Sequence, residues 1–279
     1  MASATAPTKS VYQYDETLRE HLTRLTDIRR FNDVSPEEQA LFKAGSEHTY
    51  VVDTAETIFY AQGGGQPFDT GYISAKDAGE KEKTFHVYAV RYGKEGRVLH
   101  FGHFPDNSSP FEAGDMIEQH IDDARRDMNS RIHTAGHVLG LAVRRLAEKT
   151  SELDVSELKA SHYPDAAFVE FKGIIDSKYK DAIQSGCSQS VADALPVKLY
   201  WYKPEELNEN DVITVEGMPI VAGADGKVRV VDIVGAGAYP CGGTHVPDTG
   251  FIGSMTVKSI KRQKGISKIS YSISERGGN

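Results

Sequence analysis

Two short segments, far apart in the chain, each carry two good metal ligands four residues apart. The first reads His133-Thr-Ala-Gly-His137 and the second reads Cys241-Gly-Gly-Thr-His245. On a helix this spacing puts both side chains on one face, one turn apart. Three imidazoles and one thiolate form a donor set suited to tetrahedral zinc. The sequence therefore predicts one zinc ion per chain at His133, His137, Cys241 and His245, either as a structural clip or as a catalytic centre.

Each segment taken alone has a simpler interpretation. A histidine inside an apolar helix is often a hydrogen-bonded core residue, and a cysteine beside two glycines suits an ordinary tight turn. A zinc protease helix places Glu directly after its first His. Thr134 occupies that position here, so a protease of that type is not expected. The combination of the two segments favours zinc over either simple reading.

Composition restricts the compartment and the partners. The 279 residues carry a formal net charge of −8, which argues against a general nucleic-acid coat protein. No apolar run approaches the roughly 20 residues of a membrane span. Residues 1–10 lack the apolar core of a secretory signal, and we expect them to be disordered. Only two cysteines are present, so Cys187 is expected to be an unpaired thiol in a reducing, cytoplasmic environment.

The first part of the chain predicts a small β-barrel or sandwich domain over residues 11–105. Short β-branched and aromatic segments alternate there with Gly, Pro and Asp. Residues 29–47 read as an inserted loop with a short helix that starts at Ser35-Pro36. Residues 105–110 read as a linker. The expected strands cover residues 11–28, 49–52, 57–60, 71–74, 85–91 and 98–103.

The second part predicts an α+β domain over residues 111–275 with a mostly antiparallel sheet. Apolar residues recur at helical spacing from about Asp122 to Lys149, which predicts one long helix. A more polar helix is expected over residues 176–189. The expected strands cover residues 114–121, 163–171, 196–202, 228–233, 251–259 and 266–273.

Two further features admit both a structural and a functional interpretation. Gly63-Gly-Gly65-Gln66 is either a hairpin turn or a loop whose backbone contacts a ligand; no Lys-Ser/Thr follows, so it is not a P-loop. Five basic residues near the end of the chain form either a solvated edge or a phosphate-binding patch. They are Lys258, Lys261, Arg262, Lys264 and Lys268.

The ordered motifs resemble the editing region of alanyl-tRNA synthetase and the free-standing AlaX trans-editing proteins. The segment from Thr57 to Gly71, the segment through Arg126 and Met128 to His137, and the segment from Cys241 to Gly253 carry this resemblance. It spans residues 11 to 275. The resemblance implies a stand-alone editing protein without a synthetase catalytic core. Its implied activity is hydrolysis of the ester in tRNA(Ala) mischarged with serine, with glycine as a second candidate.

The resemblance also implies roles for single residues. His133, His137, Cys241 and His245 match the family's zinc positions, and Thr57 matches the threonine linked to recognition of the serine hydroxyl. Gly63, Gly64, Gly65 and Gln66 match the glycine-rich motif that borders the editing pocket. We therefore take Thr57 and Gln66 as catalytic-site candidates. The substrate-binding candidates are Gly63, Gly64, Gly65, Lys258, Lys261, Arg262 and Lys268.

Some features depart from the family pattern, and alternatives remain. The insertion at residues 29–47 enlarges the barrel domain, and the last strand lacks an arginine pair common in synthetases. A zinc-stabilised module that binds aminoacyl-tRNA or a protein without hydrolysis is one alternative. A hydrolase repurposed for another small ester or thioester is another. The sequence has no signal for oligomeric state, and we expect a monomer that does not associate with membranes.

Overall fold

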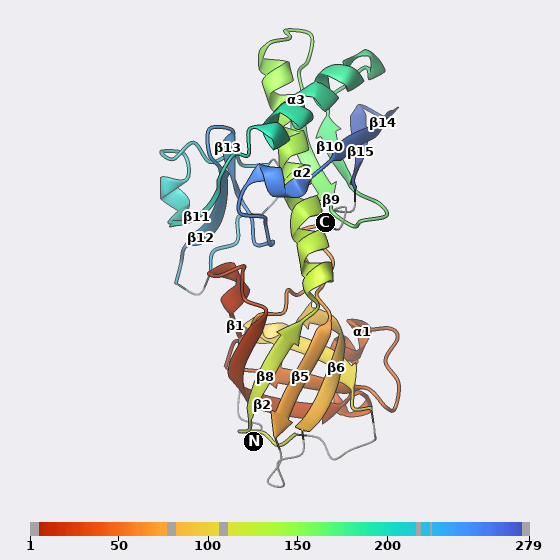
Figure 1. The fold of residues 1–279 in the computed structure, drawn as a ribbon, viewed down its shortest axis with the longest axis vertical. Helices are drawn as coiled ribbons and strands as arrows, with labels where there is room; N and C mark the ends of the chain where they lie inside the picture. Colours follow the sequence, from red (N-terminus) through yellow and green to blue (C-terminus); the bar gives the residue numbers. More distant parts are fainter. Residues whose placement is uncertain (1–5, 77–81, 106–110, 216–218, 224, 275–279) are drawn as a thin grey trace. The chain divides into compact units, whose positions relative to one another are not determined.

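The computed structural model describes all residues except 1–5, 77–81, 106–110, 216–218, 224 and 275–279. The chain divides into two compact units (Figure 1). The first comprises residues 1–63 and 67–126, and the second comprises residues 64–66 and 127–279. Gln66 and two of the motif glycines thus pack with the second unit. No helix in the described part of the chain is long and apolar enough to cross a membrane.

The first unit is built on a closed antiparallel barrel with the strand order β2-β3-β7-β6-β5-β8. A short strand pair, β1 with β4, is parallel. The strands are β1 (Lys9–Ser10), β2 (Glu20–Arg30), β3 (Tyr50–Thr54), β4 (Glu56–Thr57), β5 (Gly71–Lys76), β6 (Glu82–Tyr92), β7 (Val98–His103) and β8 (Met116–Ile121). Short 3-10 turns cover Val11–Gln13, Phe31–Asp33 and Lys94–Gly96.

The barrel confirms the predicted fold class and corrects three boundaries. β8 pairs with both β2 and β5 and so closes the barrel; the first unit therefore runs to Arg126, beyond the predicted end at residue 105. Of the predicted linker at residues 105–110, residues 106–110 lie outside the described part of the chain. Lys9–Ser10 forms β1, so the disorder predicted for residues 1–10 is wrong there. The strand expected over residues 11–28 begins only at Glu20.

The strand predicted at residues 57–60 ends at Thr57 because side chains take the backbone donors that a strand partner would otherwise use. The backbone N–H of Ile58 donates to Gln119 Oε1, and that of Phe59 donates to Thr57 Oγ1. The N–H of Tyr60 donates to Asp69 Oδ2. Buried N–H groups need a partner of some kind, and side-chain acceptors satisfy the requirement without a ladder.

The insertion at residues 29–47 is packed on the barrel and has a core of its own. The predicted helix is α1 (Pro36–Ala40), with Ser35 and Glu38 forming a capping box. Glu38 is buried and pairs with Arg29 and Arg97, and both arginines also contact Asp53. Beneath α1 lies a small apolar cluster of Phe31, Val34, Val51, Ala89, Leu99 and Phe101.

The second unit packs two antiparallel sheets and a short helix around one long helix (Figure 1). The helices are α2 (Asp123–Glu148), whose first turn still belongs to the first unit, and α3 (Lys180–Ala192). One sheet has the order β14-β15-β10-β9 and the other the order β11-β12-β13. The strands are β9 (Ser156–Ser161), β10 (Phe168–Lys172), β11 (Val197–Tyr202), β12 (Val228–Ile233), β13 (Gly237–Pro240), β14 (Met255–Gln263) and β15 (Ile266–Ile273). Three 3-10 turns cover Ser177–Tyr179, Pro204–Glu206 and Thr249–Ile252.

The long helix and the α+β class are as predicted, while the sheet is divided in two. α2 lies within two residues of the predicted bounds, and its apolar face forms the core with Val169, Phe171, Ile269 and Tyr271. β9 and β13 were not predicted, and the strand expected from residue 251 begins at Met255, after a 3-10 turn. Cys187 is a free, buried thiol of this core, and burial raises its pKa to about 12.

Candidate metal centre

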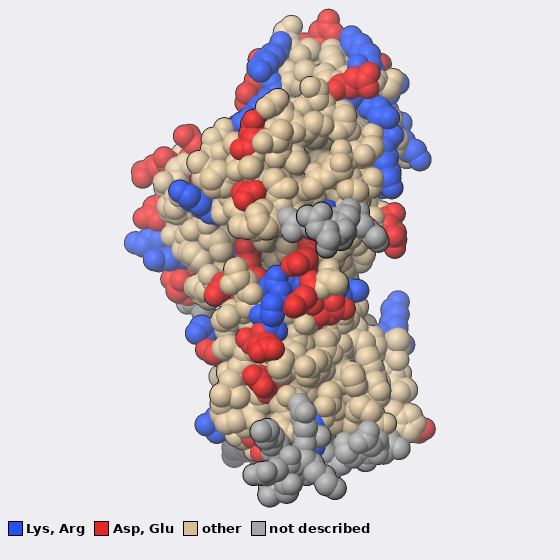
Figure 2. Space-filling model, viewed as in Figure 1, with Lys and Arg blue, Asp and Glu red and all other residues tan. Residues whose placement is uncertain are grey.

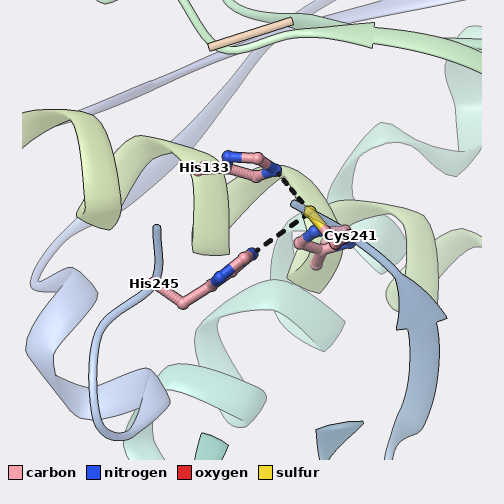
Figure 3. A group of neighbouring side chains, drawn as sticks. His133, Cys241 and His245 are labelled. Carbon is pink, nitrogen blue, oxygen red and sulfur yellow. Dashed lines mark hydrogen bonds between the residues drawn. The ribbon is translucent and has the colours of Figure 1, made fainter. Parts of the chain in front are cut away.

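The four predicted ligands meet in the second unit. His133 and His137 extend from α2, whereas Cys241 and His245 lie in the irregular segment that follows β13. Their ligand atoms all lie within 4.8 Å of one another. His133 Nε2 is 3.3 Å and His245 Nε2 is 3.6 Å from Cys241 Sγ (Figure 3). Tetrahedral zinc with ordinary bond lengths separates a sulfur and a nitrogen ligand by about 3.6 Å, so the four groups are spaced to hold one metal ion.

An unsatisfied atom supports a metal at this place. His137 Nε2 is buried and has no hydrogen-bond partner among the described residues. Burial lowers the pKa of His133 to about 4, so its imidazole is neutral at ordinary pH. Burial raises the pKa of the Cys241 thiol, and a positive charge on His133 or His245 lowers it well below the usual value. Neutral imidazole and thiolate are the forms that bind a metal.

Gln66 sets the tautomer of His133. His133, His137, Cys241 and His245 are together called the metal group. The Nδ1–H of His133 donates to Gln66 Oε1 at 2.6 Å, so Nε2 keeps its lone pair for a metal ion. Gln66 Oε1 also accepts from the backbone N–H of Thr244, and its amide donates to the Thr244 hydroxyl. The side chain is fully buried. Gln66, predicted as a catalytic-site residue, is therefore placed as a support for a metal ligand.

Arg229 and Gly243 fix the segment that carries Cys241. Arg229 Nη1 donates to the carbonyls of Cys241 and Gly243, and the Cys241 N–H donates to the Arg229 carbonyl. A Cβ at Gly243 would lie 2.1 Å from the His133 ring, so only glycine lets the segment come this close. The ligand geometry thus depends on residues of β12 and of the turn itself.

The structure adds His162 and Tyr271, which were not among the residues selected from the sequence. The His162 ring stacks on His133 with centroids 4.1 Å apart, and its Nδ1 lies 2.8 Å from the Tyr271 hydroxyl. That hydroxyl donates to the Ile132 carbonyl, so His162 Nδ1–H is the donor of the pair. A Cβ at Gly136 would lie 2.4 Å from this ring. Gly136 in mid-helix was the available signal, because the space beside the metal group is filled by His162.

A carboxylate from a distant part of the sequence, Glu157, also lies beside the site. Tyr239 donates to Glu157 Oε1 at 2.8 Å, and the Tyr239 ring lies 4.9 Å from the His137 ring. Burial raises the pKa of Glu157, while Tyr239 and His137 oppose this effect. Glu157 belongs to β9, a strand that was not predicted.

Thr57 belongs to the first unit, where its hydroxyl is already engaged. His100 Nδ1–H donates to the Val52 carbonyl, so His100 Nε2 accepts from the Thr57 hydroxyl at 2.8 Å. The same oxygen accepts from the Phe59 N–H at 3.0 Å. A hydroxyl has one donor and two acceptor lone pairs. Thr57, which is fully buried, therefore retains a single acceptor site.

The glycine-rich motif forms a turn, one of the two alternatives that the sequence left open. Gly64 and Gly65 have positive φ angles of 51° and 79°. The Gly65 carbonyl accepts from the His162 N–H, and a Cβ at Gly65 would lie 2.5 Å from the Ala160 carbonyl oxygen. Gly63, in the first unit, accepts from the Tyr60 hydroxyl. The described contacts of these glycines are with the protein itself.

The four basic residues among the substrate-binding candidates do not form one uniform patch. On the face drawn in Figure 2, Lys and Arg side chains gather over the β14–β15 hairpin. Arg262 pairs with Asp176, and Lys268 lies over the Phe168 ring, 4.0 Å from Glu170. Lys258 and Lys261 are exposed and form no ion pair with the described residues.

Comparison with known proteins places this fold and site in a family. The sequence profile of the family tRNA synthetases class II (A) matches residues 3–125. The profile of the threonyl and alanyl tRNA synthetase second additional domain matches residues 228–270, which include Cys241 and His245. His133 and His137 lie between the two matched segments.

Individual relatives agree with the profiles. An alanine–tRNA ligase of Methanosphaera stadtmanae is 30% identical over 233 residues, which cover 80% of this chain and 24% of the ligase. An alanine–tRNA ligase of Pyrococcus furiosus is 31% identical over 228 residues, covering 79% of this chain and 23% of the ligase. The alanyl-tRNA editing protein AlaX-L of Pyrococcus horikoshii is 27% identical over 270 residues, covering 95% of this chain and 58% of that protein.

The barrel, the unit that carries the His/Cys group and these matches together define a relative of the class II synthetases. More narrowly, its homologues include alanine–tRNA ligases and the alanyl-tRNA editing protein AlaX-L. It spans about a quarter of the length of the ligases that it matches.

Proposed function

We propose that this chain is a trans-editing hydrolase that deacylates Ser-tRNA(Ala), with Gly-tRNA(Ala) as a second substrate, at one zinc ion per chain. The convergence of His133, His137, Cys241 and His245, with the unpartnered His137 Nε2, carries the proposal. Homology to a protein named for alanyl-tRNA editing supports the reaction.

The bound zinc would supply Lewis-acid chemistry by polarising the ester carbonyl or activating a water. The residues of the chain prepare the site for it. Gln66 holds the His133 ring with Nε2 free, and Arg229 holds the Cys241 segment. His162 stacks on His133 and limits the space beside it. These contacts pre-organise the ligands, which reduces the reorganisation that binding and reaction require.

Thr57 is proposed to distinguish serine from alanine. Its remaining lone pair suits a donor, and a serine hydroxyl is one, whereas alanine has no hydroxyl to donate. Thr57→Val should lower kcat/KM on Ser-tRNA(Ala) by about tenfold, the equivalent of one hydrogen bond. Hydrolysis of Gly-tRNA(Ala) should change much less. An equal loss on both substrates would remove Thr57 from this role.

Lys258 and Lys261 are proposed to contact the tRNA backbone, since they are exposed and free of ion pairs with described residues. Arg262 is a weaker candidate because Asp176 already neutralises it. Lys268 contacts Phe168 and Glu170, so it would contribute less than an unpaired lysine. Phosphate contacts of this kind should make activity salt-dependent.

Incubation of the metal-loaded protein with Ser-, Gly- and Ala-tRNA(Ala) tests the proposal. Ser-tRNA(Ala) should be hydrolysed and Ala-tRNA(Ala) spared. Cys241→Ala should lower zinc content and hydrolysis together. Binding of tRNA without any deacylation at micromolar protein would favour a binding module instead. Full activity in a metal-free variant would show that zinc has no catalytic role.

A further inference from the structure

Asn129 of α2 has a buried amide without a partner. Its side chain is 2% exposed, and its Nδ2 has no hydrogen-bond partner among the described residues. In the described part of the second unit, the only other buried side-chain nitrogen or oxygen without a hydrogen-bond partner is His137 Nε2. The two residues stand four positions before and four positions after His133 on the same helix.

The parallel with His137 indicates what is missing at Asn129. An unpaired buried donor is destabilising because it has lost its hydrogen bonds to water, and native structures leave few of them. At His137 a metal accounts for the free atom, because an imidazole lone pair binds metal. An amide N–H is a donor and does not bind a metal, so Asn129 requires an acceptor, in practice an oxygen.

The position of Asn129 puts that acceptor beside the metal group. Side chains four apart on a helix have Cβ atoms about 6 Å apart, so Asn129 is an immediate neighbour of His133 along α2. The adjacent Ser130 shares a 2.8 Å hydrogen bond with the Thr244 hydroxyl, which lies between two metal-ligand positions, Cys241 and His245. A ligand held by His133 would therefore lie next to the turn of α2 that carries Asn129.

We propose that Asn129 is a substrate-binding residue whose Nδ2–H donates to an oxygen of the aminoacyl ester, either the ester carbonyl or a hydroxyl. The inference rests on the proposed function, because it takes an aminoacyl ester as the ligand. No described residue accepts from this donor, and an oxygen of the substrate would supply the acceptor. The residue thus lowers the stability of the free protein slightly and contributes to affinity.

Asn129→Leu tests this inference, because leucine is similar in shape and removes the unpaired donor. The metal-loaded protein is titrated by calorimetry with a non-hydrolysable probe, seryl-adenosine with an amide in place of the ester. Affinity should fall about tenfold, the equivalent of one hydrogen bond. The melting temperature should stay the same or rise, and zinc content should not change. Asn129→Asp, which replaces the donor by an acceptor, should bind the probe at least as weakly.

Ser130→Ala is the matched control, because it removes a side chain that has a partner. It should lower the melting temperature and should affect the probe less than Asn129→Leu does. A glycyl version of the probe identifies the acceptor. If Asn129→Leu loses as much affinity for the glycyl probe as for the seryl probe, the acceptor is a carbonyl or ribose oxygen. If only the affinity for the seryl probe falls, the acceptor is the serine hydroxyl.

Two results would overturn the inference. An Asn129→Leu variant with unchanged affinity and a lower melting temperature would make the amide structural, for instance through a buried water. A variant that loses zinc would act through the metal group. Failure of the wild-type protein to bind the probe or to deacylate Ser-tRNA(Ala) would instead contradict the proposed function, so the two failures are separable.

Discussion

Three buried histidines show one arrangement at the scale of single residues. In His133, His100 and His162, Nδ1–H donates to an oxygen, so Nε2 keeps a lone pair. Burial lowers the pKa of each ring, which keeps it neutral. In His133 that lone pair serves the metal group, and in His100 it accepts from Thr57. The oxygen that accepts from Nδ1–H therefore fixes the tautomer of each ring and leaves Nε2 able to accept a hydrogen bond or bind a metal.

Gln66→Leu should weaken metal binding, because it removes the acceptor that fixes the His133 tautomer. Loss of such a supporting contact typically costs about 10- to 100-fold in metal affinity. Competition with a chromophoric chelator measures the change. Gln66→Glu, which retains an acceptor for His133, should lose less. Unchanged affinity with lost hydrolysis would show that Gln66 acts on the substrate directly.

His100 should make the protein less stable in mild acid. Burial lowers its pKa to about 4, below the ordinary value of 6.5, so the unfolded chain takes up the proton first as the pH falls. Stability present above pH 6.5 is therefore lost as the pH drops toward about 4, by up to about 3 kcal/mol.

Urea unfolding at about pH 7 and about pH 5 measures this loss. His100→Gln, which does not titrate, should show a shallower dependence on pH than the wild type. His133 and His162 also have lowered pKa values, but they are common to both proteins, so the difference isolates His100. Identical slopes would contradict this account.

Elements with a strong local pattern were the ones that the sequence could predict. α2 follows from apolar residues at helical spacing, and the convergence of His133, His137, Cys241 and His245 follows from their spacing on that helix and in one turn. β9 alternates weakly because Glu157 is half-buried beside the metal group, and β13 has only four residues. Residues 58–60 look like a strand but are held by side chains distant in sequence. Contacts of that kind leave no local pattern.

Gly136→Ala should destabilise α2 although alanine normally favours a helix by about 1 kcal/mol. The added Cβ would lie 2.4 Å from the His162 ring and 2.7 Å from the Tyr271 hydroxyl. Overpacking of this kind typically costs about 1–3 kcal/mol. Thermal unfolding measures the loss. Gly186→Ala in α3 is the control, because its added Cβ meets Ala142 at 3.3 Å, a much smaller overlap. An equal loss of thermal stability in both variants would show that the contact with His162 does not cause the destabilisation.

At the scale of the whole molecule, all four metal-ligand positions and the residues that support them belong to the second unit. The first unit has its own closed barrel, its own apolar cores and the ion-pair network of Glu38, Arg29, Arg97 and Asp53. The two units therefore have separate sources of stability, and metal binding should affect them unequally.

Removal of the metal should loosen the second unit and leave the barrel protected. Binding stabilises a folded unit by about 4 kcal/mol when free metal exceeds its dissociation constant a thousandfold. Hydrogen exchange followed by mass spectrometry, before and after chelation, should show faster exchange around His133 and across residues 237–246. β2, β3 and β7 should keep their protection. Cys241→Ala should reproduce the pattern without a chelator. Equal acceleration in both units would mean that they unfold as one cooperative body, contrary to the division seen in the contacts.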